Sequence, residues 1–107
     1  MAWEVTFRES VIEDLRWFGR KESRTILKAA VECLKVDPLA ESRNFKTLRP
    51  NLFAQRELRL FGKYRVLFNT NVGENVVEIV AVGEKRGNSL IVQGKEFTAH
   101  HEGGPTQ

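Results

Sequence analysis

In the first part of the chain, hydrophobic residues recur first at every second position and then at the spacing of a helix. Apolar and polar residues alternate over positions 3–8, which predicts a strand with one buried face. Ser10 and Glu13 then have the spacing of a capping box, in which each side chain satisfies a free backbone amide at a helix start. We therefore expect a first helix from Ser10 to Gly19, because glycine commonly ends helices.

A second apolar stripe predicts a longer helix over residues 22–36. Its members recur at helical spacing and are Ile26, Leu27, Ala30, Val31 and Leu34. Asp37-Pro38 should end this helix, because a proline disfavours the α conformation of the residue before it. So few residues separate the two helices that we expect an antiparallel hairpin.

The second half of the chain has the pattern of an antiparallel meander. Positions 55–60 and 64–69 alternate, and positions 76–82 are rich in β-branched residues. The turns between these segments are short, which requires antiparallel neighbours. Residues 89–97, with Gly94 in the middle, are expected to add a final short hairpin.

These elements predict an α+β fold. The N-terminal strand and the two-helix hairpin should pack on one face of a twisted, mainly antiparallel sheet. The sheet residues expected to face the helices are Leu58, Leu60, Tyr64, Val66, Phe68, Val77 and Ile79. The residues that alternation sends to the opposite, open face are Glu57, Arg59, Arg65 and Glu78. Lys85 and Arg86 follow the last long strand and are expected at the rim of that face.

Length and composition indicate one globular domain. The chain has 107 residues, 41% hydrophobic and 29% charged, which excludes wholesale disorder. We expect a single domain over residues 1–98 and a flexible tail over 99–107. No apolar run approaches the ~18 residues of a membrane span, and charged residues interrupt the N-terminus where a secretory signal needs an apolar stretch. A soluble cytoplasmic protein is therefore expected.

Positive charge is concentrated in the middle of the chain. The net charge is +3, but residues 42–65 hold seven basic residues against Glu57 alone, a local balance of +6. The basic residues are Arg43, Lys46, Arg49, Arg56, Arg59, Lys63 and Arg65. Such a block is typical of a surface that binds a polyanion or an acidic partner, although a solvated basic face has the same composition.

The sequence offers no recognisable metal or cofactor site. Cys33 is the only cysteine and is expected to be a small core residue, while His100 and His101 are adjacent in the tail, so Cys/His ligand spacing is absent. Tyr64 falls on the predicted core face, which favours a structural role. What remains is a cationic surface, which can bind RNA phosphates, stabilise the charge of a phosphodiester under cleavage, or bind an acidic peptide.

Three segments carry a resemblance to a known family. They are Glu57-Leu58-Arg59, Gly62-Lys63-Tyr64-Arg65-Val66, and the apolar strand that runs from Val76 to the basic pair Lys85-Arg86. With the strand–helix–helix start, this layout resembles the RelE/ParE superfamily of type II toxin–antitoxin toxins over residues 2–92. The resemblance implies a compact α+β toxin that a cognate antitoxin holds inactive. It implies either cleavage of messenger RNA in the ribosomal A site without a metal, as in RelE-like members, or poisoning of DNA gyrase, as in ParE-like members.

The resemblance also implies roles for individual residues. Arg65 matches an arginine that contacts the scissile phosphate, and Lys85 or Arg86 stands where a second phosphate-contacting arginine occurs. Gln55 and Glu57 replace the paired lysines of RelE-like enzymes, and Ile91 replaces a late aromatic. Glu57 is the best available general base, but it is equally an ion-pair partner for Arg59 or Arg65.

We therefore expect a toxin that acts as a ribosome-dependent mRNA endonuclease without a cofactor. The predicted catalytic residues are Arg65, Lys85, Arg86 and Glu57, and the predicted RNA-binding residues are Lys46, Arg49, Arg56, Arg59 and Lys63. A gyrase inhibitor without chemistry of its own, or a toxin-like fold retained only to pair with an antitoxin, are the alternatives. A cognate antitoxin should cover the basic block in a hetero-oligomer, and substitutions at Arg65 or Glu57 should not unfold the domain.

Overall fold

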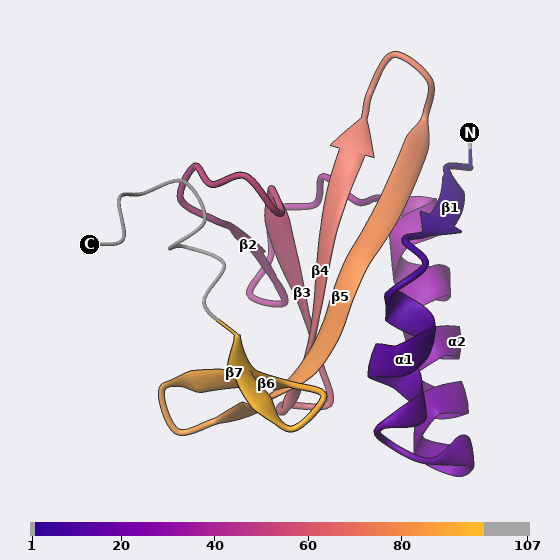
Figure 1. Ribbon diagram of the computed structural model, residues 1–107. Coiled ribbons are helices and arrows are strands. Elements are labelled where there is room, and N and C mark those ends of the chain that lie inside the picture. The colour runs from indigo at the N-terminus through magenta and orange to yellow at the C-terminus, as the bar shows by residue number, and fades with distance from the viewer. Residues whose placement is uncertain (1, 98–107) are drawn as a thin grey trace.

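The computed structural model describes residues 2–97, which form two helices and seven strands in one α+β layer structure (Figure 1). The elements are β1 (Glu4–Phe7), α1 (Val11–Arg16), α2 (Arg20–Val36), β2 (Phe45–Thr47), β3 (Arg56–Leu60), β4 (Tyr64–Asn71), β5 (Val76–Arg86), β6 (Ser89–Val92) and β7 (Lys95–Phe97). The expected tail over 99–107, with His100 and His101, lies outside the described residues.

The sheet has the strand order β2-β3-β4-β5-β6-β7, and β1 pairs with β5. Only the β1–β5 pair is parallel among the described strands; the others are antiparallel. Both helices lie together on one side of the sheet, and the hairpin of β6 and β7 turns away from them (Figure 1). The predicted fold class, the meander and the final hairpin are confirmed. The short strand β2 was not predicted, because three residues are too few to show a period.

The main core lies between the helices and the sheet. It joins Val11, Ile26, Ala30 and Leu34 of the helices to the sheet residues expected to face them, all seven of which are in the cluster. Each fully buried Val, Leu, Ile or Phe side chain among them contributes about 1.5–3 kcal/mol. The alternation of β3 and β4 therefore assigns the two sheet faces correctly.

A β-bulge in β5 changes the sheet face that lies opposite the helices. Leu67 pairs with Ala81 but Phe68 pairs with Ile79, so Val80 is an extra residue in β5. Val80 and Ala81 build a second cluster with Ala54 and Leu67, against which Leu48, Phe53, Leu90 and Phe97 pack. The expectation of an open face is thus wrong in part, because the β2–β3 loop and the β6–β7 hairpin cover some of it.

Two local predictions about the helices are also wrong. Ser10 has helical backbone angles (φ −62°) and makes no side-chain cap hydrogen bond, so the capping box does not form. Cys33 is exposed, because it lies beside the stripe of Ile26, Ala30 and Leu34 that faces the core. Partial burial, and then the charge of Glu32, raise the pKa of the Cys33 thiol, which makes it a weak nucleophile at neutral pH.

Candidate functional site

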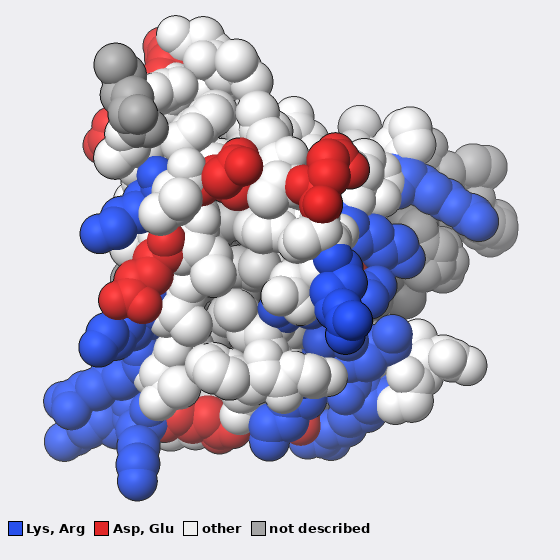
Figure 2. Space-filling model, turned by 180° about the vertical axis from the view of Figure 1, so that it is seen from behind, with Lys and Arg blue, Asp and Glu red and all other residues white. Residues whose placement is uncertain are grey.

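A groove of about 490 Å³ lies on the sheet face opposite the helices. One wall is the segment from β2 through the β2–β3 loop, the other is the β6–β7 hairpin, and β3, β4 and β5 form the floor. The residues that line it are Lys46, Thr47, Leu48, Arg49, Asn51, Glu57, Arg59, Leu67, Lys85, Asn88, Ser89, Leu90, Glu96 and Phe97. Figure 2 shows Lys and Arg side chains gathered on the side of the molecule away from the helices. We call this hollow the basic groove.

Four cations come together at the basic groove. Lys46 belongs to β2, Arg49 to the β2–β3 loop, Arg59 to β3 and Lys85 to β5. Lys46, Arg49 and Lys85 are exposed, and Arg59 is partly exposed. Four positive charges around one hollow favour an anionic ligand, since their mutual repulsion falls when such a ligand binds.

Glu57 lies between two arginines at the floor of the groove. Its carboxylate oxygens are 3.6 Å from Nε of Arg59 and 3.8 Å from Nε of Arg65, and its side chain is 14% exposed. Nε of Arg59 is buried and makes no hydrogen bond within the described residues. The ion-pair alternative for Glu57 is therefore the arrangement seen, and it leaves one buried donor of Arg59 unsatisfied.

Arg65 is not on the open surface, contrary to expectation. It is 8% exposed, does not line the groove, and donates from Nη1 to the carbonyl oxygen of Tyr64 at 3.0 Å. Alternation predicted the sheet face of Arg65 correctly, since it shares that face with Glu57, but the side chain is buried there. Its contact with Glu57 makes Arg65 a support for the groove floor.

Two other predicted RNA-binding residues lie elsewhere. Arg56 is 7% exposed and donates to the carbonyl oxygens of Pro38 (2.6 Å) and Ala40 (2.9 Å). It shares the core face of β3 with Leu58, two residues further on, so it cannot reach the groove. Lys63 is in the β3–β4 turn, on the helix side of the sheet, 3.8 Å from a carboxylate oxygen of Glu22.

Arg86 is exposed but does not line the groove. Its Nη2 is 3.4 Å from a carboxylate oxygen of Glu84. Successive strand residues point to opposite faces, so only Lys85 of this basic pair faces the groove. Ile91, in the position where the resemblance implies an aromatic, pairs with Glu84 in the β5–β6 ladder.

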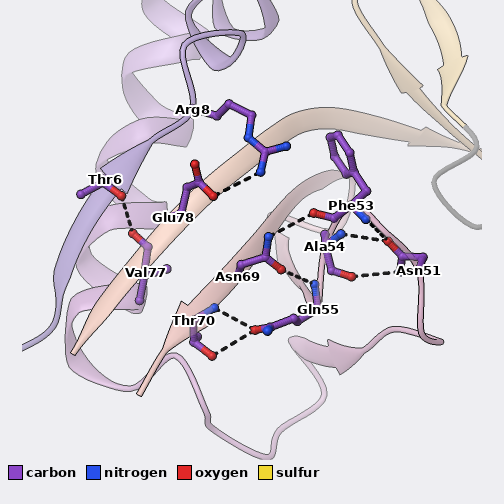
Figure 3. A network of polar contacts seen from close by, with 10 residues as sticks. All are labelled: Thr6, Arg8, Asn51, Phe53, Ala54, Gln55, Asn69, Thr70, Val77 and Glu78. Atoms are coloured by element: carbon purple, nitrogen blue, oxygen red, sulfur yellow. Dashed lines mark hydrogen bonds and ion pairs between the residues drawn. The ribbon is translucent and has the colours of Figure 1, made fainter. Parts of the chain in front are cut away.

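A network of side-chain amides fixes the loop that carries Arg49. Oδ1 of Asn51 accepts from the backbone N–H groups of Phe53 (2.7 Å) and Ala54 (2.9 Å), and Nδ2 donates to the carbonyl oxygen of Ala54 (2.9 Å). Asn69 of β4 donates to the carbonyl oxygen of Phe53 at 3.1 Å (Figure 3). Sequence reasoning missed Asn51; its signal was the turn-forming run Pro50-Asn51.

The hairpin wall adds one carboxylate that the sequence did not single out. Glu96 lines the groove, and its Oε2 accepts from the hydroxyl of Ser89 at 3.1 Å. The groove thus holds two carboxylates, Glu57 in ion pairs and Glu96 without a cationic partner among the described residues. Glu96 is therefore a second candidate for proton transfer with a ligand in the groove.

No group of three or more His, Cys, Asp and Glu side chains within residues 2–97 is placed to hold a metal ion. No helix in the same range is long and apolar enough to cross a membrane.

A two-helix hairpin on one sheet face and a basic groove on the other define a small α+β protein with the fold of RelE-type toxins. The chain matches the RelBE2 toxin–antitoxin complex from Mycobacterium tuberculosis with a TM-score of 0.67 and 25% identity, covering 79% of this chain and 100% of that chain. It matches the RelE–RelB complex from Pyrococcus horikoshii OT3 with a TM-score of 0.63 and 22% identity, covering 83% of this chain and 100% of that chain. No protein-family model matches the sequence, and no curated protein matches it significantly. The resemblance noted in the sequence is confirmed by these structures.

Proposed function

We propose that this protein is the toxin of a type II toxin–antitoxin system and that it cleaves messenger RNA on the ribosome. The observation that carries the proposal is the convergence of Lys46, Arg49, Arg59 and Lys85 on one groove, where the buried Nε of Arg59 lies 3.6 Å from Glu57 and makes no hydrogen bond within the described residues. The match to the RelBE2 complex supports it. Action on ribosomes would place the protein in the cytoplasm.

Each cation has a distinct role in this proposal. Lys46 and Arg49, on the wall formed by β2 and the β2–β3 loop, bind the backbone of the message through phosphate contacts. Arg59 of β3 and Lys85 of β5, which are separated by β4, stabilise the charge that develops on the scissile phosphate. Arg65 acts through Glu57, which it holds against Arg59, and is a positioning residue. Arg86 stays outside the groove.

The proton acceptor is one of the two groove carboxylates. Glu57 can act as the general base only when the bound phosphate draws Arg59 away from it, because its carboxylate is held between Arg59 and Arg65. Glu96 has no such constraint. Comparing Glu57→Gln with Glu96→Gln in one cleavage assay distinguishes the two, since the isosteric amide cannot accept the proton.

An antitoxin is the proposed protein partner. Both matched structures are toxin–antitoxin complexes. A segment of the antitoxin with acidic side chains would fill the basic groove, replace the phosphate charges of RNA and so block the site. The neighbouring gene is expected to encode such a protein, and the two products should form a hetero-oligomer.

One observation favours a second candidate, a toxin that inhibits by binding alone, such as a gyrase inhibitor. Glu57 is held in two ion pairs and Ile91 stands where the resemblance implies an aromatic, so the described groove has few groups for proton transfer. Such a toxin would need the basic groove for contact but no general base.

The test is cleavage of a defined message on programmed ribosomes, read by primer extension. Lys85→Ala and Arg59→Ala should each slow cleavage by about 100-fold, the effect of removing one donor to a developing oxyanion. Arg86→Ala, a matched cation outside the groove, should cut at nearly the normal rate. A purified protein that leaves ribosome-bound message intact but blocks gyrase supercoiling would replace the nuclease with the second candidate.

A further inference from the structure

A second hollow lies on the helix side of the sheet, at the end where α1 and α2 are joined. It has a volume of about 620 Å³, and its lining residues are Phe18, Gly19, Arg20, Lys21, Glu22, Thr25, Phe61, Lys63 and Tyr64. We call it the Phe61 groove. It uses the opposite sheet face from the basic groove and shares no lining residue with it.

The β3–β4 turn holds Phe61 in an unusual conformation. The backbone N–H of Lys63 donates to the carbonyl oxygen of Leu60 at 3.2 Å, and Phe61 (φ 52°) and Gly62 (φ 76°) between them are both left-handed. Two left-handed residues make a type I′ turn, whose first position strongly favours asparagine, aspartate or glycine. A positive φ strains a bulky residue, and such strain concentrates at functional positions.

This strained residue is presented to solvent. Phe61 is 62% exposed, although its ring contacts Tyr64 edge to face with 6.3 Å between centroids. Phe18 contacts the same Tyr64 at 5.4 Å, also edge to face. Both Phe18 and Phe61 thus contact Tyr64 edge to face, and all three aromatics line the hollow. A hollow lined by rings in this arrangement suits an inserted side chain better than a stacked base, which needs a free parallel ring face.

The rim of the groove is positively charged. Arg20, Lys21 and Lys63 line it against one carboxylate, Glu22, which lies 3.8 Å from Nζ of Lys63. Arg20 and Lys21 are exposed in the first turn of α2, where the helix dipole disfavours cations. No ion pair involves either of them within residues 2–97. Figure 2 shows a dense group of basic side chains at this end of the helices.

We propose that the Phe61 groove binds an acidic segment of a partner protein. The segment inserts one aliphatic or aromatic side chain against Phe61 and Phe18 and places carboxylates beside Arg20 and Lys21. Its binding is independent of the proposed nuclease activity, because the basic groove stays accessible on the other sheet face. A protein bound here can therefore recruit the toxin to a target, or hold it, without blocking RNA.

The test uses the isotope-labelled full chain and a synthetic peptide of about twelve residues in which Asp and Glu alternate with Leu and Phe. The peptide should shift the amide resonances of Phe18, Lys21 and Thr25, and these shifts should persist when Lys46 and Arg49 of the basic groove are both replaced by Ala, because that groove also attracts acidic segments. A control peptide with Asn and Gln in place of the acids should bind about tenfold more weakly. If the acidic peptide shifts none of these amides at millimolar concentration, the proposal is overturned.

Two substitutions sharpen this test. Phe61→Asn should weaken peptide binding at least tenfold, the usual cost of an aromatic anchor, and should keep or raise the melting temperature because asparagine suits the turn. Lys21→Glu, on the rim, should weaken binding about fivefold without changing the fold. Unchanged affinity in both variants overturns the proposal. A single-stranded RNA hexamer that shifts the same amides more strongly than the peptide overturns it in favour of an RNA site.

Discussion

The carboxylate of Asp14, in α1, accepts a hydrogen bond of 2.5 Å from the side-chain amide of Gln93, in the β6–β7 turn. The same carboxylate accepts from the backbone N–H of Val82 at 3.0 Å. On that edge, β5 pairs with β1 as far as Ile79 and with β6 only from Glu84, so Asp14 fills a gap in the ladder. One buried side chain therefore joins the helix, the central strand and the wall of the basic groove.

Removing this carboxylate should loosen the hairpin. Asp14→Ala leaves the buried N–H of Val82 without an acceptor, which costs about 1–3 kcal/mol of unfolding free energy. In Asp14→Asn the amide oxygen can still accept from the backbone N–H of Val82. Its NH2 group can donate to the side-chain oxygen of Gln93 once the Gln93 amide has rotated by 180°. The unfolding free energy of this variant should therefore stay within about 1 kcal/mol of the wild type. Urea denaturation of the three proteins measures both effects. Equal losses in the two variants would contradict this account.

Asp14 also gives stability a specific pH dependence. Burial raises the pKa of the Asp14 carboxyl above its usual 3.8, and the hydrogen bonds from Gln93 and Val82 only partly oppose this. The folded state therefore holds the proton more tightly than the unfolded state, so the contribution is complete below the unfolded pKa and is lost as the pH rises through the folded pKa. The unfolding free energy of the wild type, relative to Asp14→Asn, should decline over that window. A difference that is flat or rises with pH would show that the hydrogen bonds dominate.

The hydrophobic pattern of the sequence predicted the sheet face of each residue better than it predicted how exposed that residue is to solvent. Leu58, Leu60 and Tyr64 alternate with Arg59 and Glu57, and because one face was strongly apolar the register could be set without any tertiary information. What lies over a face is decided by segments distant in the chain. The covering loop and hairpin have weak local patterns, so their packing over the second face was not predictable.

The same limit explains the two misplaced arginines. Arg56 begins β3 on the core face, and nothing local shows that the carbonyl oxygens of Pro38 and Ala40 will come to meet it. Arg65 lies on the predicted face but is buried there, and nothing local in the sequence shows this burial. The bulge at Val80 was equally hidden, because its run of β-branched neighbours reads as an uninterrupted strand.

Arg56 and Arg59 provide a matched pair on opposite faces of one strand. Arg56→Met removes two charge-assisted hydrogen bonds and should lower the unfolding free energy by about 2 kcal/mol or more, while RNA affinity at the basic groove stays unchanged. Arg59→Met should do the reverse: weaker RNA binding with little loss of stability. Thermal melting and fluorescence anisotropy with a short RNA measure the two quantities. The idea fails if Arg56→Met weakens RNA binding while the fold is intact.

Gly94 tests how closely α1 holds the hairpin turn. Gly94 has a φ of 78°, and a Cβ there would lie 2.6 Å from Cη2 of Trp17. Gly94→Ala should therefore cost about 1–3 kcal/mol, from backbone strain and from displacement of the indole. Gly73→Ala is the control, since its nearest contact, Oδ1 of Asn71, is at 3.6 Å. Combining Gly94→Ala with Trp17→Ala should cost less than the sum of the two single changes; strict additivity would mean that the two residues do not interact.

Glu57→Gln separates the structural role of this carboxylate from a catalytic one. The change leaves Arg65, whose side chain is 10% exposed, without a counter-charge, so the unfolding free energy should fall by about 1–3 kcal/mol. This revises the expectation from sequence that stability would be unaffected. RNA affinity should rise, because the groove loses a negative charge and Arg59 is released, and the affinity should depend more steeply on salt.

Cleavage is the deciding measurement for Glu57. If Glu57 is the base, Glu57→Gln should cleave the message on programmed ribosomes at least about 100-fold more slowly despite tighter binding. Glu96→Gln is the matched control: it also removes one negative charge from the groove, but its carboxylate has only the Ser89 hydroxyl as a described hydrogen-bond partner, so stability should hardly change. Normal cleavage by Glu57→Gln together with slow cleavage by Glu96→Gln would transfer the role of base to Glu96 and leave Glu57 as the residue that positions Arg59.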